Sequence, residues 1–289
     1  MHDSTGYGRQ DALGTGALSS YMAEPSYSDV LDRIQSAIQA ASEIFGRFTP
    51  GEIAAEYKAG HDPVTEADRT LDAVLRENLL RTGEGWLSEE TADDRSRLSC
   101  SQVWVVDPID GTREFVAGIP EFCVSIAMVD RGRPIAGGIC NPATHEVFLG
   151  SVDSGITYNG EAARVSQRST LSGALVLASR SEEKRGEWKV FREAPFEVQA
   201  TGSVAYKLAR VAAGLADATF TLTPKHIWDV AGGTALVESA GGSVRTIAQQ
   251  RVNCAEESLL VPGLFACGPL LQRPLAEFLD AHFRAVSRE

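Results

Sequence analysis

The most constraining feature of the chain is the segment Asp107–Thr112, which reads Asp-Pro-Ile-Asp-Gly-Thr and directly follows the apolar run Val103–Val106. Four apolar residues in succession predict a short buried strand. Pro108 is expected to end that strand, because proline lacks an amide hydrogen and fixes its own φ. Gly111 permits close approach of the backbone to a ligand, and the amides of Gly111 and Thr112 are expected at a helix start, where an anion binds well. Carboxylates beside such an anion site indicate Mg²⁺ and a phosphate ester.

The composition limits the classes of partner. The 289 residues are 43% hydrophobic, which is enough for two domains or one large α/β unit. A net charge of −12 argues against a nucleic-acid polymer or an anionic membrane, but not against a small anionic substrate held through bound cations. The five cysteines show no metal-like spacing and are expected as buried thiols in a reducing cytoplasm. Neither a membrane span nor a signal peptide is expected, since the chain has no long apolar run and no basic-then-apolar leader.

The first part of the chain, residues 25–170, is expected to form an α+β domain that follows a mobile tail at residues 1–24. Apolar residues every three or four positions predict helices over residues 26–48 and 63–80. Apolar or alternating runs separated by turn residues predict an antiparallel sheet after Val103. Its strands are expected over residues 123–129, 134–140 and 146–150.

The second part, residues 171–289, is expected to form an α/β domain that completes the site. The boundary near residue 170 follows from a polar stretch between two strand-like runs. The expected elements are strands over residues 174–178, 196–200 and 259–266 and helices over residues 204–213, 230–240 and 274–286.

Acidic residues recur in positions that suggest a common site. Glu89 and Glu90 follow Leu87-Ser88, Asp107 and Asp110 follow the Val103–Val106 strand, and Asp229 lies in Ile227–Gly233. Taken alone, Asp229 is explained as a helix cap and Glu89-Glu90 as a solvated acidic turn. The tandem aspartates are harder to explain in this way, because capping the next helix requires only one of them.

Together these segments resemble the inositol monophosphatase family of Mg²⁺-dependent, lithium-sensitive phosphatases. The matching pieces are Val64–Asp68, Ser88–Glu90, Trp104–Thr112 and Ile227–Gly232, which stand in the family's order and spacing. The Asp-Pro-Ile-Asp-Gly-Thr and Trp-Asp-Val-Ala-Gly motifs are together far more specific than a lone glycine-rich loop. The resemblance implies a layered αβαβα sandwich of the type shared with fructose-1,6-bisphosphatase, and it favours a homodimer.

The resemblance also implies a metal centre of two to three Mg²⁺ ions. The ligands would be four carboxylates and one backbone carbonyl: Glu89, Asp107, Asp110, Asp229 and the carbonyl of Ile109. Two ions would share Asp107, while a third would rest on Glu89 and water, with Glu90 in support. Carboxylates crowded into one pocket resist ionisation, and two or three Mg²⁺ ions would supply about +4 to +6 of neutralising charge.

Water activation and phosphate binding are implied in the same way. Asp68 and Thr112 would form a dyad that orients and deprotonates the attacking water. Glu89 belongs to the catalytic group through the ions that activate this water. The amides of Gly111 and Thr112 would bind the phosphate.

Two other classes of protein share part of this pattern. A haloacid-dehalogenase-type phosphatase also carries Asp-Gly-Thr after a strand, but its second aspartate follows two residues after the nucleophile, whereas Asp110 follows Asp107 by three. A non-catalytic protein that binds metal and phosphate would have no need for the pair Asp68 and Thr112. Hydrolysis by metal-activated water therefore accounts for more of the motif than either alternative.

The substrate is less constrained, because features of two branches of the family are mixed. Leu87–Glu90, Asp110–Phe115 and Ala178–Ser181 resemble the 3′(2′),5′-bisphosphate nucleotidases, whereas Gly202–Lys207 and Trp228–Gly232 suit the inositol-phosphate branch. The expected reaction is hydrolysis of a small phosphorylated metabolite of the inositol monophosphate type to an alcohol and inorganic phosphate. Conversion of adenosine 3′,5′-bisphosphate to AMP is the alternative.

Four residues are candidates for contact with the leaving group: Ser203, Lys207, Arg180 and His226. Each has a plainer interpretation. Ser203 stands where it would cap a helix, Lys207 one turn later would be solvated, and Arg180 precedes the charged run 182–185, which is expected to be a solvated loop. A single histidine such as His226 is more often structural than functional.

Overall fold

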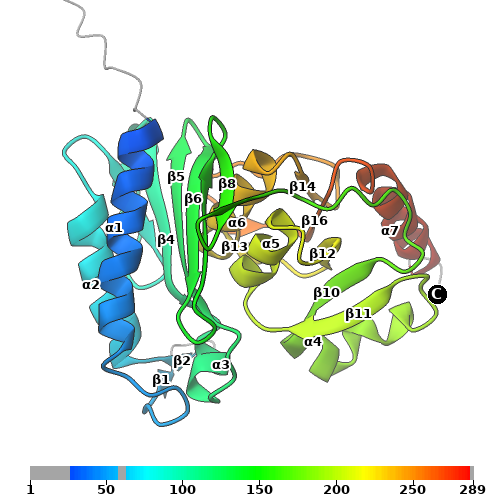
Figure 1. Cartoon of the computed structure of the whole chain (residues 1–289), viewed down its shortest axis with the longest axis horizontal. Coiled ribbons are helices and arrows are strands. Elements are labelled where there is room, and N and C mark those ends of the chain that lie inside the picture. Colours follow the sequence, from blue (N-terminus) through cyan, green and yellow to red (C-terminus); the bar gives the residue numbers. More distant parts are fainter. Residues whose placement is uncertain (1–26, 58–62, 287–289) are drawn as a thin grey trace, which may run out of the picture.

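The computed structural model of the chain describes residues 27–57 and 63–286, so the tail expected at residues 1–24 lies outside the described residues. Figure 1 shows alternating layers that run from α1 and α2 at the left to α7 at the right. The layers are an outer helix pair, a seven-stranded sheet, an inner helix pair, a five-stranded sheet and further outer helices. This is the expected αβαβα sandwich.

The first outer layer consists of two amphipathic helices, α1 (Tyr27–Phe45) and α2 (Glu66–Leu79). Both bury one apolar stripe against the seven-stranded sheet, because their apolar residues recur at helical spacing. Thr65 caps α2, and its backbone amide donates to the Asp68 carboxylate at 2.7 Å. The capping box therefore fixes Asp68 at the first turn. Before α2, β1 (Glu56–Tyr57) pairs with β2 (Pro63–Val64).

The seven-stranded sheet has its strands side by side in chain order from β3 to β9. They are β3 (Gly85–Ser88), β4 (Gln102–Asp110), β5 (Cys123–Asp130), β6 (Arg133–Asn141), β7 (Glu146–Ser151), β8 (Gly155–Tyr158) and β9 (Glu161–Ala163). A short 3₁₀ helix (Ser96–Ser99) precedes β4. The neighbouring strands from β4 to β9 are antiparallel as expected, whereas β3 and β4 are parallel.

The end of β4 differs from the expectation that Pro108 stops the strand. The strand continues to Asp110, and its register with β5 shifts between Asp107 and Asp110. Proline is tolerated at this irregularity because the residues that bulge out donate no ladder hydrogen bond. The bulge brings both aspartates to the same end of the sheet, where the helix α3 (Thr112–Val116) begins.

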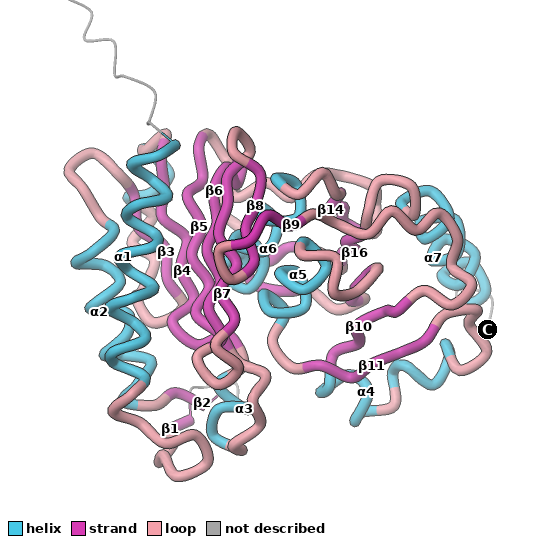
Figure 2. Tube along the Cα trace, viewed as in Figure 1, coloured by secondary structure: helices cyan, strands magenta, loops and turns pink. Residues whose placement is uncertain are grey.

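The inner helix pair is α5 (Val204–Ala212) and α6 (Ile227–Ser239), and Figure 2 shows both helices between the strands of the two sheets. From Val230 to Val237 every residue of α6 is buried, and all of them except Thr234 are apolar or glycine, as expected of a helix segment covered on all sides. It lies directly on the seven-stranded sheet: a Cβ added at Gly232 would be 2.7 Å from Ser125 Oγ, and one at Gly137 would be 2.6 Å from the Gly232 oxygen. Glycine at both positions permits this close contact.

The five-stranded sheet has the order β11-β10-β12-β16-β14, with β10 parallel to both of its neighbours. Its strands are β10 (Leu175–Ser179), β11 (Glu197–Thr201), β12 (Ala218–Thr221), β14 (Ser243–Thr246) and β16 (Leu264–Cys267). The remaining elements are α4 (Arg180–Arg185), a 3₁₀ helix (Glu187–Phe191) and α7 (Gln272–Val286). Among the described residues, no helix is both long and apolar enough to cross a membrane.

Two expectations for this half of the chain were wrong. The single strand expected over residues 259–266 is interrupted at Pro262-Gly263, so that β15 (Leu260–Val261) pairs with β13 (Lys225–His226) and only β16 joins the sheet. The charged run 182–185, expected as a solvated loop, lies in helix α4, where Ser179 is the N-cap. Glu182 is buried there, because Thr221, Thr223, Lys225 and Trp188 all donate to its carboxylate.

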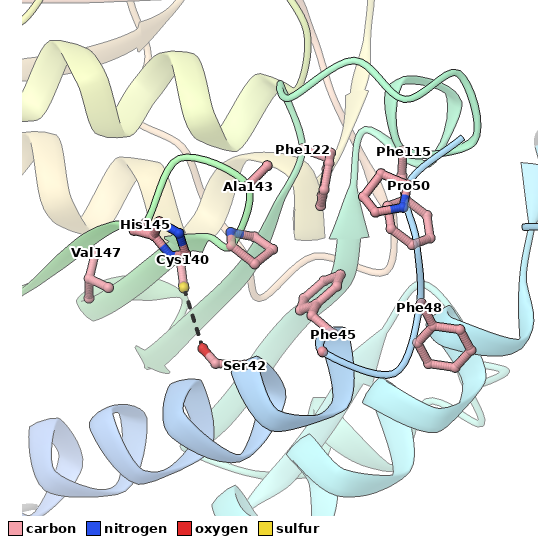
Figure 3. Close-up of a pocket in the computed structure, with 12 residues that line it drawn as sticks. Ser42, Phe45, Phe48, Pro50, Phe115, Phe122, Cys140, Ala143, His145 and Val147 are labelled. Carbon is pink, nitrogen blue, oxygen red and sulfur yellow. Dashed lines mark hydrogen bonds between the residues drawn. The ribbon is translucent and has the colours of Figure 1, made fainter. Parts of the chain in front are cut away.

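Aromatic side chains hold α3 in place from behind. The rings of Phe115 and Phe122 lie 4.9 Å apart and both contact Phe45 at the end of α1. Figure 3 shows these rings along the wall of an apolar cavity of about 460 Å³, with Ser42 and Cys140 at its other end. Because these packed rings tend to keep their positions, they fix the start of α3 relative to the sheet.

Candidate active site

A cavity of about 210 Å³ lies where the end of β4 meets the first turns of α3 and α6. It collects residues that are far apart in the sequence but were singled out from it. The predicted site residues in its wall are Glu89, Asp107, Ile109, Asp110, Gly111, Thr112, His226 and Asp229. The structure therefore brings together every metal ligand and phosphate-binding residue that the resemblance implies.

Three of the aspartates form a compact oxygen cluster. Asp107, Asp110 and Asp229 each offer an oxygen within 4.8 Å of the others. The pKa values of Asp107 and Asp229 lie well above the ordinary range, mainly because the carboxyls are buried and secondly because neighbouring carboxylates repel their charge. A hard divalent cation removes both causes at once, since it replaces water and supplies positive charge. The donor set thus fits Mg²⁺.

Asp110 is oriented from the inner helix layer. Its Oδ2 accepts hydrogen bonds from the Ser203 hydroxyl at 2.7 Å and the Ala205 amide at 2.5 Å. Burial raises the pKa of Asp110, and these two bonds oppose that rise. Both bonds use the same oxygen, so the arrangement aligns the carboxylate without engaging Oδ1.

Asp68 and Thr112 are in direct contact, and of the two only Thr112 belongs to the cavity wall. The Thr112 hydroxyl lies 3.3 Å from Asp68 Oδ1 and 2.9 Å from the Ile109 oxygen, and it can donate its single hydrogen to only one of them at a time. The Thr65 amide and hydroxyl donate to Asp68 Oδ2. Burial raises the pKa of Asp68, which brings this carboxylate closer to the range of a base that accepts a proton near neutral pH.

The turn between β4 and α3 has the backbone geometry expected of an anion site. Gly111 caps α3 with φ of +97°, and a Cβ at this position would lie 2.9 Å from the Glu121 oxygen. Only glycine satisfies both conditions without strain. The amides of Gly111 and Thr112 consequently stand at the helix start, as the sequence predicted, beside the carboxylates of β4.

Comparison with known proteins identifies the family to which this site belongs. The model of the inositol monophosphatase family matches residues 27–286. The chain belongs to the inositol monophosphatase family. Inositol monophosphatase 3 of Solanum lycopersicum is 33% identical over 76% of this chain and 86% of its own length. Nus factor SuhB of Xylella fastidiosa is 34% identical over 65% of this chain and 70% of its own length.

A solved structure supports the same conclusion. The Thermotoga maritima IMPase superposes with a TM-score of 0.77 at 26% identity, covering 89% of this chain and 99% of that one. The protein is therefore a phosphoric monoester hydrolase of a metal-dependent family that acts on small phosphorylated substrates. Because the chain belongs to this family, it is not a phosphatase of the haloacid-dehalogenase type.

In this site, His226 and Ser203 each donate a hydrogen bond to an aspartate of the oxygen cluster. The His226 amide donates to Asp229 Oδ2 at 3.0 Å, and its ring stacks on Trp228 with centroids 4.6 Å apart. Ser203 is the N-cap of α5, as its position in the sequence predicted, and the same hydroxyl donates to Asp110. Both residues thus position carboxylates of the oxygen cluster.

Lys207 and Arg180, which were predicted to meet the substrate, both have partners within the protein, and their contact with substrate stays a prediction. Lys207 is buried, and its ammonium donates to the backbone oxygens of Ser203 at 2.6 Å and Thr201 at 3.3 Å, so it is not solvated either. Arg180 binds both oxygens of Glu121, at 2.8 and 2.5 Å. Both cations are therefore engaged by the protein itself.

Glu114 and Glu121 were missed as site residues, although Glu114 was quoted as part of a branch motif. Glu114 lines the cavity from α3, while Glu121 accepts hydrogen bonds from Arg180 and from the Gly202 amide. The signal that could have indicated Glu114 is its place two residues after Thr112, the predicted phosphate-binding residue. Nothing local marks Glu121, whose partners come from the other half of the chain.

Proposed function

We propose that this protein is a Mg²⁺-dependent phosphatase that hydrolyses a small monoester of the inositol monophosphate type to an alcohol and inorganic phosphate. The observation that carries the proposal is the cluster of Asp107, Asp110 and Asp229 oxygens within 4.8 Å of one another. The cluster shares its cavity with the helix start at Gly111-Thr112. Carboxylates that bind a cation and backbone amides that bind an anion, placed in one cavity, suit a phosphate ester bound to metal.

The roles of the individual residues follow from their positions. Glu89, the three aspartates and the Ile109 carbonyl would hold two to three Mg²⁺ ions. When bound, these ions would activate water, polarise the phosphoryl group and stabilise the departing alkoxide. The Gly111 and Thr112 amides would bind phosphate oxygens.

The proton on the attacking water would leave through Thr112 and Asp68. The Thr112 hydroxyl accepts a hydrogen bond from the water while it donates its own hydrogen to Asp68 Oδ1. Thr65 holds Asp68 in this position from the opposite side. A water nucleophile attacks in line, and no phosphoenzyme forms.

The inositol-phosphate type is preferred over the bisphosphate nucleotide for a specific reason. Arg180 and Lys207 were the cations expected to hold a second phosphate. One is paired with Glu121 and the other is buried on backbone oxygens, so neither is available without breaking those contacts. A substrate with one phosphate requires no such rearrangement.

Phosphate release in a Mg²⁺ titration tests this function, with inositol 1-phosphate and adenosine 3′,5′-bisphosphate compared with and without lithium. We expect Mg²⁺-dependent, lithium-inhibited release with a preference for the inositol ester. Preference for the nucleotide would transfer the protein to the bisphosphate nucleotidase branch. Binding of Mg²⁺ without release from any monoester would instead support a non-catalytic role.

A further inference from the structure

Glu114 is an acidic wall residue of the site cavity for which the proposed chemistry has no use. It stands on α3, two residues after Thr112, and only 8% of its surface is exposed. Its carboxylate is not part of the cluster of mutually close metal-binding oxygens found among the described residues. A buried carboxylate of this kind requires a partner, because burial of an unsatisfied acceptor is costly.

The position of the Glu114 side chain is fixed by the second half of the chain. A Cβ added at Gly202 would lie 2.6 Å from Glu114 Cγ and 2.8 Å from Cδ, so the carboxylate lies directly over this glycine. Gly202 in turn donates its amide to Glu121 Oε2 at 2.6 Å, and Arg180 binds the same carboxylate. Arg180 therefore acts behind the cavity wall, where it helps to hold the surface on which Glu114 rests.

The protein supplies few hydrogen-bond donors to the Glu114 carboxylate. Within residues 27–57 and 63–286, the only hydrogen bond to it comes from its own backbone amide. Its charged neighbours include the carboxylate of Asp110, which repels it, and the buried ammonium of Lys207, which donates two hydrogen bonds to backbone oxygens. Because Glu114 lines the cavity, further donors to its carboxylate can come from a molecule that enters there.

We propose that Glu114 is a specificity-determining residue that accepts a hydrogen bond from a hydroxyl group of the substrate's alcohol part. The inference rests on the proposed phosphatase function and deepens it: the substrate is a phosphate ester of a polyhydroxylated alcohol. A carboxylate accepts strongly from a hydroxyl, whereas it repels a second phosphate at the same place. Glu114 would thus favour a substrate with a hydroxyl at this place and disfavour one with a second phosphate.

The test compares two esters in three variants of the full chain. The substrates are inositol 1-phosphate and p-nitrophenyl phosphate, whose leaving group has no hydroxyl apart from the ester oxygen. Glu114→Ala should raise KM for inositol 1-phosphate about tenfold, because a hydrogen bond to a charged acceptor is lost. It should leave kcat and the KM for p-nitrophenyl phosphate unchanged. Glu114→Gln, which keeps an acceptor oxygen, should fall between Glu114→Ala and the wild type.

Glu77→Ala, on the exposed face of α2, is the matched control and should change neither substrate. An equal loss for both esters in Glu114→Ala, or no loss for either, would overturn the assignment of Glu114 while the phosphatase function stands. Wild-type protein that releases phosphate from neither ester at saturating Mg²⁺ would overturn the proposed function itself, and this inference with it.

Discussion

At the scale of single residues, the site depends on carboxylates that are costly to bury without metal. Asp110 illustrates how the chain controls one of them, because Ser203 and Ala205 both hold Oδ2. Two bonds to one oxygen fix the plane of the carboxylate. As a proposed metal ligand, Asp110 is thus oriented before any ion binds, which lowers the entropy cost of binding.

Replacing Asp110 by asparagine should remove both the oriented carboxylate and its negative charge. We predict that Asp110→Asn lowers kcat by roughly a hundredfold or more, because a neutral amide is a poor Mg²⁺ ligand. Phosphate release across a Mg²⁺ titration measures the effect. Asp153→Asn, at an exposed turn, serves as the control. Retention of most of the activity in Asp110→Asn at saturating Mg²⁺ would contradict the metal assignment.

Thr112 should matter to the chemical step rather than to metal binding. We predict that Thr112→Ala keeps Mg²⁺ affinity but lowers kcat by about two to three orders of magnitude, the usual contribution of a proton-transfer residue. Thr112→Ser keeps the hydroxyl and should retain most of the turnover. Calorimetric Mg²⁺ titration and steady-state kinetics separate the two effects. Normal turnover in Thr112→Ala would exclude the relay to Asp68.

At the scale of secondary-structure elements, the site forms where α6 lies against the seven-stranded sheet. Asp229 begins α6, and Asp107 and Asp110 end β4, so the distance between the three carboxylates depends on how closely helix and sheet pack. Gly232 sets that distance, since a Cβ there would be 2.7 Å from Ser125 Oγ and 3.0 Å from the Ile126 oxygen. The metal centre is therefore sensitive to packing one turn away from its ligands.

Gly232→Ala should separate these elements slightly. We predict destabilisation by about 1–3 kcal/mol, typical of overpacking, together with weaker Mg²⁺ binding because Asp229 moves away from Asp107. Thermal unfolding and Mg²⁺ titration test both parts. Gly46→Ala is the matched control, because its added Cβ would meet only ordinary contacts, the nearest at 3.5 Å. Unchanged Mg²⁺ affinity in Gly232→Ala would show that the helix position does not control the site.

The chain's elements also show what local pattern can predict. The periodicity that predicted helices over residues 26–48 and 63–80 is confirmed by α1 and α2, because each buries one regular stripe. The strands β3, β12 and β14 were not predicted, since each contributes only four residues to its sheet. Such short segments carry too little periodic signal, and their neighbours across the sheet decide their conformation.

At the scale of the whole molecule, stability and metal binding should be linked through pH. The pKa of Asp107 lies well above its ordinary value of 3.8, because of burial first and nearby carboxylates second. A raised pKa means that the folded state binds this proton more tightly than the unfolded state. The stabilisation from Asp107 is therefore complete below 3.8 and is lost as the pH rises through the raised pKa.

We predict that, without metal, Asp107→Asn gains stability relative to the wild type as the pH rises above about 4, and that the gain levels off at higher pH. Mg²⁺ should reverse the order at neutral pH, since it stabilises only the protein with an intact site, by about 2.7 kcal/mol at a hundredfold excess over Kd. Thermal unfolding of both proteins from pH 4 to 8, with EDTA or Mg²⁺, provides the measurement. A difference independent of both pH and Mg²⁺ would contradict the linkage.

The homodimer favoured by the family resemblance and the domain boundary near residue 170 stay predictions at this scale. The last strand of the first sheet ends at Ala163 and the first strand of the second sheet begins at Leu175. Helix α6, however, comes from the second half and packs on the first sheet, so the two halves share a core. Sedimentation of the full chain would establish the oligomeric state.

By itself, the sequence determined the family and predicted the metal ligands and the anion site, because these depend on residue types at short, fixed spacings such as Asp107–Thr112. Tertiary structure alone decided that the side chains of Arg180 and Lys207 bind groups of the protein itself. Arg180 and Glu121 are 59 residues apart, and their pairing depends on which surfaces of the two halves meet. Burial of Lys207 and the exposure of Glu114 to the cavity are likewise products of packing between layers. Local patterns carry no information about such contacts, because their energies arise only when distant elements exclude water together.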